Sequence, residues 1–145
     1  MATFITYDEE RSRAFLSLAG VRIVAVGDPE HDEVMVDVLG SDTAEKGRIV
    51  AEPPADEDAA NQGMGAWHVN GADEFETVLD GRGIVEFMTT KGPVAVLLEA
   101  GDVMAVEGAE HRYRPLSPQA WILRFAGADL AARETGRVAG PWPNP

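Results

Sequence analysis

The second half of the chain alternates apolar and polar side chains in short, regularly spaced runs. Apolar and β-branched runs recur at spacings of about 8–12 residues, and Gly, Pro or Asp residues separate them. This pattern predicts antiparallel strands in a sandwich or barrel. The expected strands are 75–79, 84–89, 94–98, 103–106, a short one around Tyr113, and 121–125.

The first half of the chain is less regular. Residues 8–20 have acidic side chains in a first turn, Phe15 and Leu18 on one side, and Gly20 as a stop, which predicts a short helix over one end of the core. The other apolar runs in this half are rich in β-branched residues, which favours strands. They lie at 21–26, 33–39 and 48–50.

Three further segments have distinctive compositions. Residues 52–63 combine two prolines with a charge run and no periodicity, which predicts a loop. A mobile surface loop is one interpretation, and a flap over a site is the other, since the segment leads directly to His68. Residues 128–135 predict one closing helix, and residues 140–145 an irregular tail that docks through Trp142.

Length and composition narrow the class of protein. A chain of 145 residues without an internal repeat predicts a single domain, 1–145. The absence of cysteine excludes disulfides, thiolate metal sites and thiol nucleophiles, and leaves His, Asp, Glu and neutral oxygens as metal ligands. A net charge of −13 disfavours nucleic acid and anionic membranes as partners.

The N-terminal residues do not have the pattern of a secretory signal. Residues 1–10 are acidic where a signal requires a basic region followed by an apolar run. No stretch approaches the roughly 20 apolar residues that would cross a bilayer. We therefore expect a soluble cytoplasmic protein whose partner is a small molecule.

Polar side chains gather in the stretch 67–76. In extended chain His68 and Asn70 point to the same side, and a short turn can bring Glu74 and Glu76 to that side as well. A cluster of an imidazole, an amide and two carboxylates is therefore expected here.

A second imidazole, His111, follows the predicted strand 103–106. Two histidines and a carboxylate suit divalent iron, nickel, manganese or zinc and leave coordination positions open, so the pattern favours a metal site. On spacing alone, two unrelated histidines are the alternative. The third histidine, His31, lies in a turn-like acidic stretch and is expected to be solvated.

Strand alternation adds two further candidates. Tyr113 shares a face with His111, where it either packs in the core with its hydroxyl bonded locally or transfers protons. Arg124 either pairs with an acid such as Glu76 or binds a carboxylate or enolate of the substrate.

Residues 64–126 resemble the cupin superfamily. The first cupin motif runs as His-x-His, three or four residues, Glu, six residues and Gly, and is matched here by His68-Val69-Asn70, Glu74 and Gly81. The second runs from Gly-Asp through a short strand to Pro-x-Gly-x-x-His. Here it corresponds to Gly101-Asp102 and Gly108-Ala109-Glu110-His111.

Within that superfamily the chain looks most like the acireductone dioxygenases, through the stretches 78–83 (Val-Leu-Asp-Gly-Arg-Gly) and 122–125 (Ile-Leu-Arg-Phe). The resemblance implies an all-β jelly-roll barrel (double-stranded β-helix), here with short N- and C-terminal helices. It also implies an iron or nickel ion held by His68, Glu74 and His111, and cleavage of an enediol by molecular oxygen. Pairing of barrels as a homodimer would also fit the superfamily.

Two departures from the family pattern bear on function. Asn70 stands where the second His of the first motif belongs, so it either leaves a coordination position open or binds weakly through its amide oxygen. Glu76 stands where the dioxygenases place an arginine, which argues against acireductone itself and makes Glu76 a candidate general base.

Two more departures concern the fold. The segment 101–111 is one residue shorter than the family motif, with Glu107 in its turn, and strands at 21–50 replace the long helical part of the dioxygenases.

Three functional hypotheses follow. The first is a metal-dependent dioxygenase acting on a small enol, diketone or hydroxyketone, with Arg124 holding the anion and Glu76 or Tyr113 moving the proton. The second is a non-oxidative isomerase, cyclase or dehydratase in which the metal is a Lewis acid and Glu76 the base. The third is a small-ligand-binding barrel without turnover.

Overall fold

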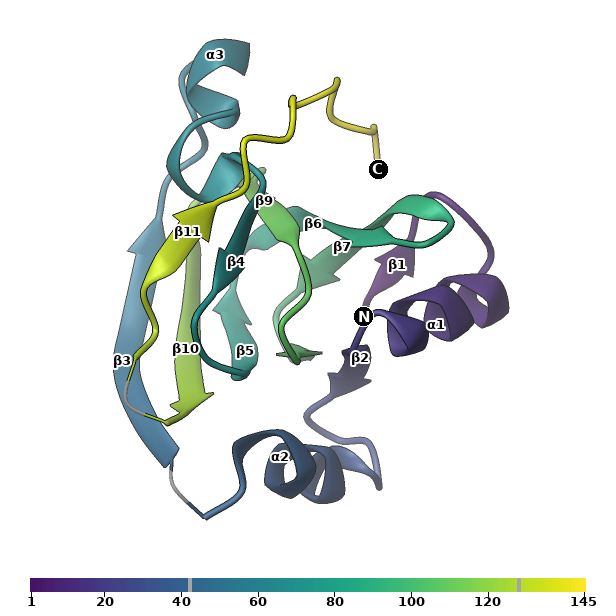
Figure 1. Cartoon of the computed structure of the whole chain (residues 1–145), viewed down its shortest axis with the longest axis vertical. Helices are drawn as coiled ribbons and strands as arrows, with labels where there is room; N and C mark the ends of the chain where they lie inside the picture. The colour runs from purple at the N-terminus through teal and green to yellow at the C-terminus, as the bar shows by residue number, and fades with distance from the viewer. Residues whose placement is uncertain (42, 128) are drawn as a thin grey trace.

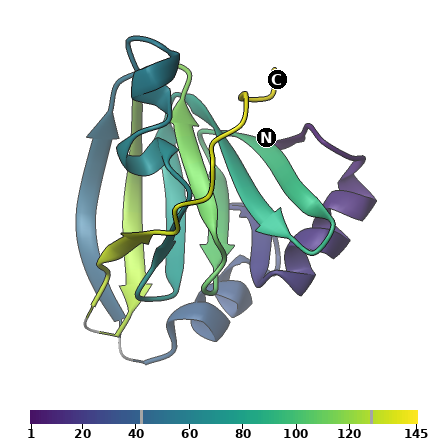
Figure 2. The same ribbon diagram turned by 45° about the horizontal axis from the view of Figure 1, so that its top comes forward.

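Two antiparallel sheets face each other and enclose the core (Figures 1 and 2). The computed structural model describes residues 1–41, 43–127 and 129–145. The arrangement confirms the antiparallel strands expected from the alternation pattern and the all-β jelly-roll barrel implied by the family resemblance. No helix in the described part of the chain is both long and apolar enough to span a membrane.

One sheet has six strands in the order β1-β7-β6-β9-β4-β11. Its strands are β1 (Thr3–Phe4), β4 (His68–Asn70), β6 (Arg82–Thr89), β7 (Gly92–Glu99), β9 (His111–Pro115) and β11 (Ala132–Glu134). The other has five strands in the order β2-β8-β5-β10-β3. Its strands are β2 (Val21–Ala25), β3 (Thr43–Ala51), β5 (Glu74–Asp80), β8 (Asp102–Val106) and β10 (Gln119–Ala126).

Alternate residues of the strands point between the sheets and form the main core. Because successive side chains of a strand face opposite ways, each strand contributes every second residue to this core. The inward residues of β5 to β8 are Val78, Val85, Phe87, Val94, Val96, Leu98, Met104 and Val106.

Helix α1 (Glu9–Leu18) confirms the first predicted helix. Asp8 caps it by accepting a hydrogen bond from the Arg11 backbone N–H at 2.8 Å. Leu16 packs into the core, but Leu18 is 78% exposed, so the expected apolar side was wrong at that position. The buried face contains Ser12 and Leu16, one helical turn apart.

Helix α2 (His31–Leu39) corrects the strand predicted at 33–39. Its buried residues Val34 and Val38 are four positions apart and pack with Phe75 on the outer face of the five-stranded sheet. β-Branched residues favour a strand only weakly, and the burial of one face of the helix outweighs this preference.

His31 is the first residue of α2 rather than part of a loop. Its ring packs edge-on against Phe75, with ring centroids 5.3 Å apart. It therefore lies on the outer face of the five-stranded sheet.

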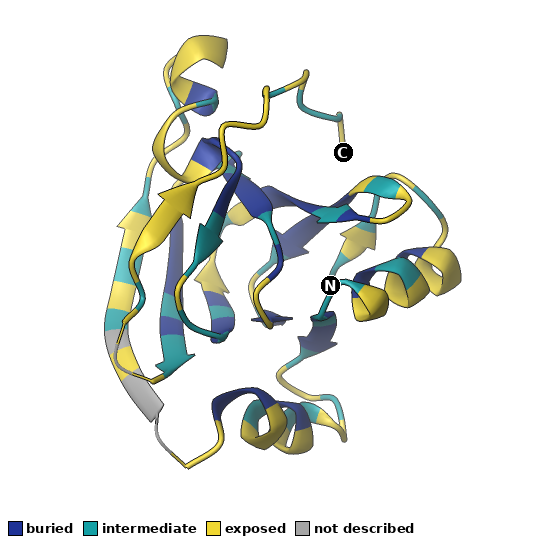
Figure 3. Cartoon of the chain, viewed as in Figure 1, coloured by how far each residue is buried: buried dark blue, intermediate teal, exposed yellow. Residues whose placement is uncertain are grey.

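The C-terminal segment also differs from expectation. The helix predicted at 128–135 was wrong for the described residues, because Ala132–Glu134 forms strand β11 and pairs antiparallel with β4; residue 128 lies outside the described part. Strand β4 meets β9 at one residue pair only, so β11 supplies most of its backbone partners. Figure 3 shows the exposed β11 beside the more buried β4.

The segment 52–63 is largely a loop, as predicted, but it contains the helical turn α3 (Glu57–Ala60) and leads into the 3₁₀ turn η1 (Gly63–Gly65). The strand expected at 48–50 is longer and forms β3. The predicted docking of the tail is confirmed, because Trp142 packs against the apolar outer face of the six-stranded sheet.

Candidate metal centre

His68 and His111 are direct cross-strand partners on β4 and β9. Their ring centroids are 4.5 Å apart. Each Nδ1 lies within hydrogen-bond distance of a backbone carbonyl two residues earlier, at 2.7 Å from Ala66 and 2.9 Å from Ala109. A carbonyl can only accept, so each Nδ1 carries the proton and each Nε2 keeps its lone pair for a metal or a proton.

Glu74, at the start of β5, is the carboxylate beside these rings. Its Oε2 lies 3.9 Å from Nε2 of His111 and accepts a 2.7 Å hydrogen bond from the Asn70 amide. Burial raises the pKa of Glu74 to about 7, while the Asn70 hydrogen bond opposes the rise and Asp73 adds to it. Burial and the neighbouring His68 lower the pKa of His111 to about 4, so its imidazole is neutral near pH 7.

Glu76 is a second buried acid, two positions further along β5 on the same face. Burial raises its pKa well above the ordinary value and the charge of Glu74 adds to the rise, whereas the Trp121 indole N–H counteracts it. That indole N–H is buried and has no hydrogen-bond partner among the described residues. The site therefore has two neighbouring carboxyl groups shielded from water.

These side chains share one pocket of about 270 Å³. Tyr113 also lines it, and its hydroxyl donates to Oε1 of Gln119 at 2.9 Å, so the hydroxyl is bonded locally. Burial raises the Tyr113 pKa further above its ordinary value. The remaining walls are Ile49, Met64, Met104, Trp121 and Leu123.

Met64 belongs to the turn η1, so the segment that follows the 52–63 loop borders the pocket. A separate pocket of about 220 Å³ beside β2, α1 and α2 is lined by none of the candidate metal ligands.

Arg124 is not brought to the pocket. In the β5–β10 ladder Leu123 pairs with Glu76, whereas Arg124 pairs with Phe75 on the other face of the sheet. Arg124 is therefore not among the described residues that line the pocket, and the structure supports neither of the two roles predicted for it. Alternation along β10 gave the relative faces correctly, but it could not say which face would be internal.

The nitrogen and oxygen atoms that line the pocket are of the types that bind divalent metal ions. Two imidazole Nε2 atoms and one carboxylate face the same pocket, and Asn70 adds an amide oxygen. Within the described residues no group of three His, Cys, Asp or Glu side chains already stands in position to hold an ion. The Asn70 amide donates a 2.7 Å hydrogen bond to Oε2 of Glu74, an oxygen that a metal ion would need.

The C-terminal segment supports both histidine-bearing strands, which sequence reasoning missed. The Thr135 backbone N–H donates to the carbonyl of Trp67 at 3.0 Å, just before His68. Glu110, just before His111, accepts from Arg137 through both carboxylate oxygens at 3.0 Å. The only sequence signal for the Glu110–Arg137 pair is opposite charge, which does not specify contacts between distant residues, and the backbone bond from Thr135 to Trp67 has no sequence signal.

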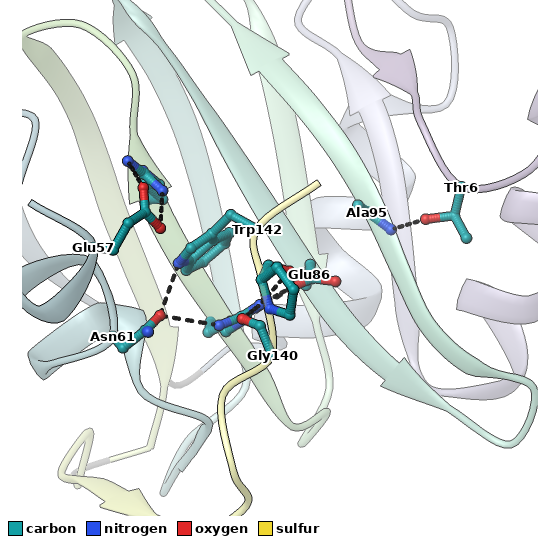
Figure 4. Close-up of polar contacts among 10 residues, drawn as sticks. Thr6, Glu57, Asn61, Glu86, Ala95, Gly140 and Trp142 are labelled. Carbon is teal, nitrogen blue, oxygen red and sulfur yellow. Dashed lines mark hydrogen bonds and ion pairs between the residues drawn. The ribbon is translucent and has the colours of Figure 1, made fainter. Parts of the chain in front are cut away.

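A buried arginine on the outer face of β9 was also missed. Arg112 is 1% exposed and donates to Glu86 on β6 at 2.8 Å, to Asn61 at 3.3 Å and to the carbonyl of Gly140 at 3.0 Å. Its guanidinium lies 3.9 Å from the ring centroid of Trp142. Figure 4 shows Asn61, Glu86, Gly140 and Trp142 converging at this point. Arg112 thereby links β6, the 52–63 loop and the C-terminal tail, on the face of β9 opposite to His111.

No family model matches the chain, and no curated protein sequence matches it. The structure is similar to that of acireductone dioxygenase from Bacillus anthracis, solved with a cadmium ion in its active centre. The two are 16% identical, the match covers 89% of this chain and 94% of that one, and the TM-score is 0.59.

The structure is also similar to that of oxalate decarboxylase from Bacillus subtilis, at 14% identity, 79% of this chain, 27% of that one and a TM-score of 0.50. The Lactobacillus farciminis enzyme in a formate complex matches at 15% identity, 79% of this chain, 30% of that one and a TM-score of 0.50. The chain thus spans less than a third of these decarboxylase chains. At such identities the likeness establishes the fold, a cupin-type barrel, and confirms the predicted resemblance.

Proposed function

We propose that this cupin-type barrel is a metal-dependent enzyme acting on a small enol, diketone or hydroxyketone, and that it uses molecular oxygen as a dioxygenase. The observation that carries the proposal is the convergence of the His68 and His111 imidazoles with Glu74 in one pocket. His68, His111 and Glu74 would hold the ion, with Asn70 beside them. Iron or nickel is the first candidate, and manganese or zinc the alternative.

A divalent ion bound there would supply Lewis-acid chemistry toward two adjacent substrate oxygens. Glu76 supplies the proton acceptor, because its carboxyl group lies in the same pocket and burial, which raises its pKa, makes its carboxylate form a stronger base. The walls formed by Met104, Trp121 and Leu123 exclude water from the substrate carbon that loses its proton.

The dioxygenase proposal is supported by the likeness to acireductone dioxygenase, which is similar over most of both chains. It is tested with an oxygen electrode, using the iron-loaded and nickel-loaded protein and a panel of small hydroxyketones. Oxygen uptake that requires protein, metal and substrate together supports it. Uptake no faster than that of the free metal ion contradicts it.

A second candidate is non-oxidative enolisation, and the position of Arg124 favours it. With Arg124 outside the pocket and Glu76 inside, the described residues provide a base but no arginine to hold an enediolate. Exchange of the substrate's α-proton for deuterium, followed by NMR under anaerobic conditions, identifies this reaction. Ligand binding without exchange or oxygen uptake identifies the third hypothesis, a binding protein.

Replacing Glu76 by glutamine tests its role as the base. Glu76→Gln keeps the shape of the side chain but removes its basicity, so we expect turnover to fall by about 100-fold or more while metal content stays unchanged. The measurements are α-proton exchange and metal analysis on the same preparation. Unchanged exchange would remove Glu76 as the base.

Replacing Asn70 by histidine tests whether residue 70 lies close enough to the proposed ion to bind it. Asn70 shares a side of β4 with His68 and contacts Glu74. Asn70→His adds a borderline donor and removes the amide N–H that occupies Glu74 Oε2, so we expect nickel or zinc affinity to rise by about tenfold. Calorimetric titration of the metal-free protein measures it, with Asn70→Ala as the control for loss of the amide alone. Binding by Asn70→His no tighter than binding by Asn70→Ala would show that a side chain at residue 70 does not ligate the ion.

A further inference from the structure

We propose that the ligand of the candidate metal centre carries an unbranched aliphatic tail, and that this tail occupies a second pocket under the segment 52–65. The second pocket has a volume of about 160 Å³ and is lined by none of the candidate metal ligands. The proposal rests on the proposed function for the position of the reactive oxygens. It narrows the substrate class to hydroxyketones or enols with one long apolar arm.

The two pockets follow each other along two strands. On β3, Ile49 lines the pocket of the candidate metal centre and Ala51 lines the second pocket. On β9, His111 lines the first pocket, Tyr113 lines both and Pro115 lines the second. Residues two apart on a strand share a face and lie about 7 Å apart. The two pockets are therefore consecutive sections of one groove.

Met64 borders both sections of this groove. Its side chain is 39% exposed and unbranched, so rotation about its bonds can widen the connection without a change in the backbone. Tyr113, which also borders both sections, is 7% exposed and its hydroxyl is held by Gln119. The connection therefore has one fixed wall and one adaptable wall, which suits the passage of a flexible chain.

The segment 52–65, which roofs the second pocket, is packed against the barrel. Arg114 on β9 donates to Glu57 of α3 at 3.1 Å. A Cβ at Gly65 would overlap the carbonyl oxygen of Ala60, so the turn η1 approaches α3 as closely as only glycine allows. The second pocket is therefore built into the fold by contacts between this segment and β9.

The walls of the second pocket favour an aliphatic occupant. Its apolar lining consists largely of small side chains, those of Ala51, Pro54, Ala59, Ala60 and Pro115. Arg114 also lines it but is already paired with Glu57, so it offers no free charge to an anionic tail. An aliphatic tail gains from leaving water and leaves no polar group unsatisfied.

The spacing of the groove sets the length of the tail. The step of about 7 Å from one inward residue of β9 to the next corresponds to about six bonds of an extended chain. A tail of about six carbons therefore reaches from oxygens beside His111, past Tyr113, into the second pocket. A substrate with a shorter arm would leave this pocket empty.

Hydroxyacetone and hydroxymethyl hexyl ketone form a matched pair for the test, because they share the hydroxyketone end and differ only in tail length. Their affinities for metal-free and for zinc-loaded protein are measured by ligand-observed NMR titration. We expect the hexyl compound to bind tighter by about tenfold or more. In spectra of methyl-labelled protein, the hexyl compound alone should shift the signals of Ala51 and Ala60.

Two variants of β3 make the test specific to the second pocket. Ala51→Phe places a ring in that pocket from the inner face of the strand, at a position where an aromatic residue suits a strand. We expect it to bind hydroxyacetone like the wild-type protein and to lose the gain from the hexyl tail. Val50→Phe adds the same ring to the outer face, where Val50 is 69% exposed, and should keep the gain.

Equal affinity of the wild-type protein for the two ketones would overturn the proposal, as would absence of binding or a gain that Ala51→Phe leaves unchanged. Far-UV circular dichroism checks the fold of both variants, and if Ala51→Phe does not fold, the shifts at Ala51 and Ala60 decide. Zinc content, oxygen uptake and α-proton exchange are measured separately. A tail-dependent affinity in a protein that neither binds zinc nor turns over would contradict the proposed function alone.

Discussion

Replacing Arg112 by alanine is expected to lower the free energy of unfolding by about 3–5 kcal/mol, the usual cost of removing one partner of a buried ion pair. Glu86 is itself buried and would be left without its cation. The change also removes the donor to the Gly140 carbonyl and the cation beside the Trp142 ring, so the tail loses two of its contacts but keeps the apolar packing of Trp142. Urea denaturation followed by tryptophan fluorescence measures the effect.

Two further variants make this prediction specific. Arg114 lies two residues along β9 and pairs with the exposed Glu57 at 3.0 Å, so Arg114→Ala should cost no more than about 1 kcal/mol. The double variant Arg112→Met with Glu86→Leu removes both charges and should regain most of the lost stability. A loss for Arg112→Ala no larger than for Arg114→Ala would show that the pair is not important for stability. If Arg112→Ala does not fold, folding of the double variant still tests the explanation.

Replacing either His68 or His111 by alanine is expected to abolish stable retention of a divalent metal. Each imidazole offers an Nε2 lone pair fixed by a backbone hydrogen bond at Nδ1. Loss of such a ligand should weaken affinity by more than the 10–100-fold typical of losing an outer-shell partner. Elemental analysis after dialysis gives the metal content per chain, and calorimetry with nickel or zinc gives the affinity.

The third histidine provides the matched control. His31 lies on α2 against Phe75, on the outer face of the five-stranded sheet, so His31→Ala should retain metal like the wild-type protein. Far-UV circular dichroism of all three variants separates loss of a ligand from loss of the fold. Metal retention by a folded His68→Ala or His111→Ala protein would show that the ligand assignment is wrong.

Strand alternation was sufficient to predict most of the barrel and the grouping of the candidate site. From residue 74 onward the expected strands lie within the observed ones, because burial of one face imposes a period of two on the sequence. The same alternation placed His68 with Asn70, and Glu74 with Glu76, on shared faces. The pocket contains all four, together with His111 and Tyr113.

Prediction was wrong where the deciding partner is distant in sequence. Residues 33–39 have a strand-like composition, but packing of Val34 and Val38 against the outer face of the sheet selects a helix. Residues 132–134 form a strand because they pair with the backbone of β4, which pairs with β9 at one residue pair. Arg124 was misplaced because alternation relates faces along one strand without saying which of them points into the barrel.

By itself, then, the sequence determined the all-β class and which side chains of a single strand share a face, because both depend on spacings within single strands. The cross-strand pairing of His68 with His111 and the burial of Glu76 beside Glu74 were decided only by the tertiary structure. So was the C-terminal segment that holds the two histidine strands through Thr135 and Arg137. These features depend on which strands become neighbours, and that is set by the free energy of packing the whole chain rather than by any local pattern.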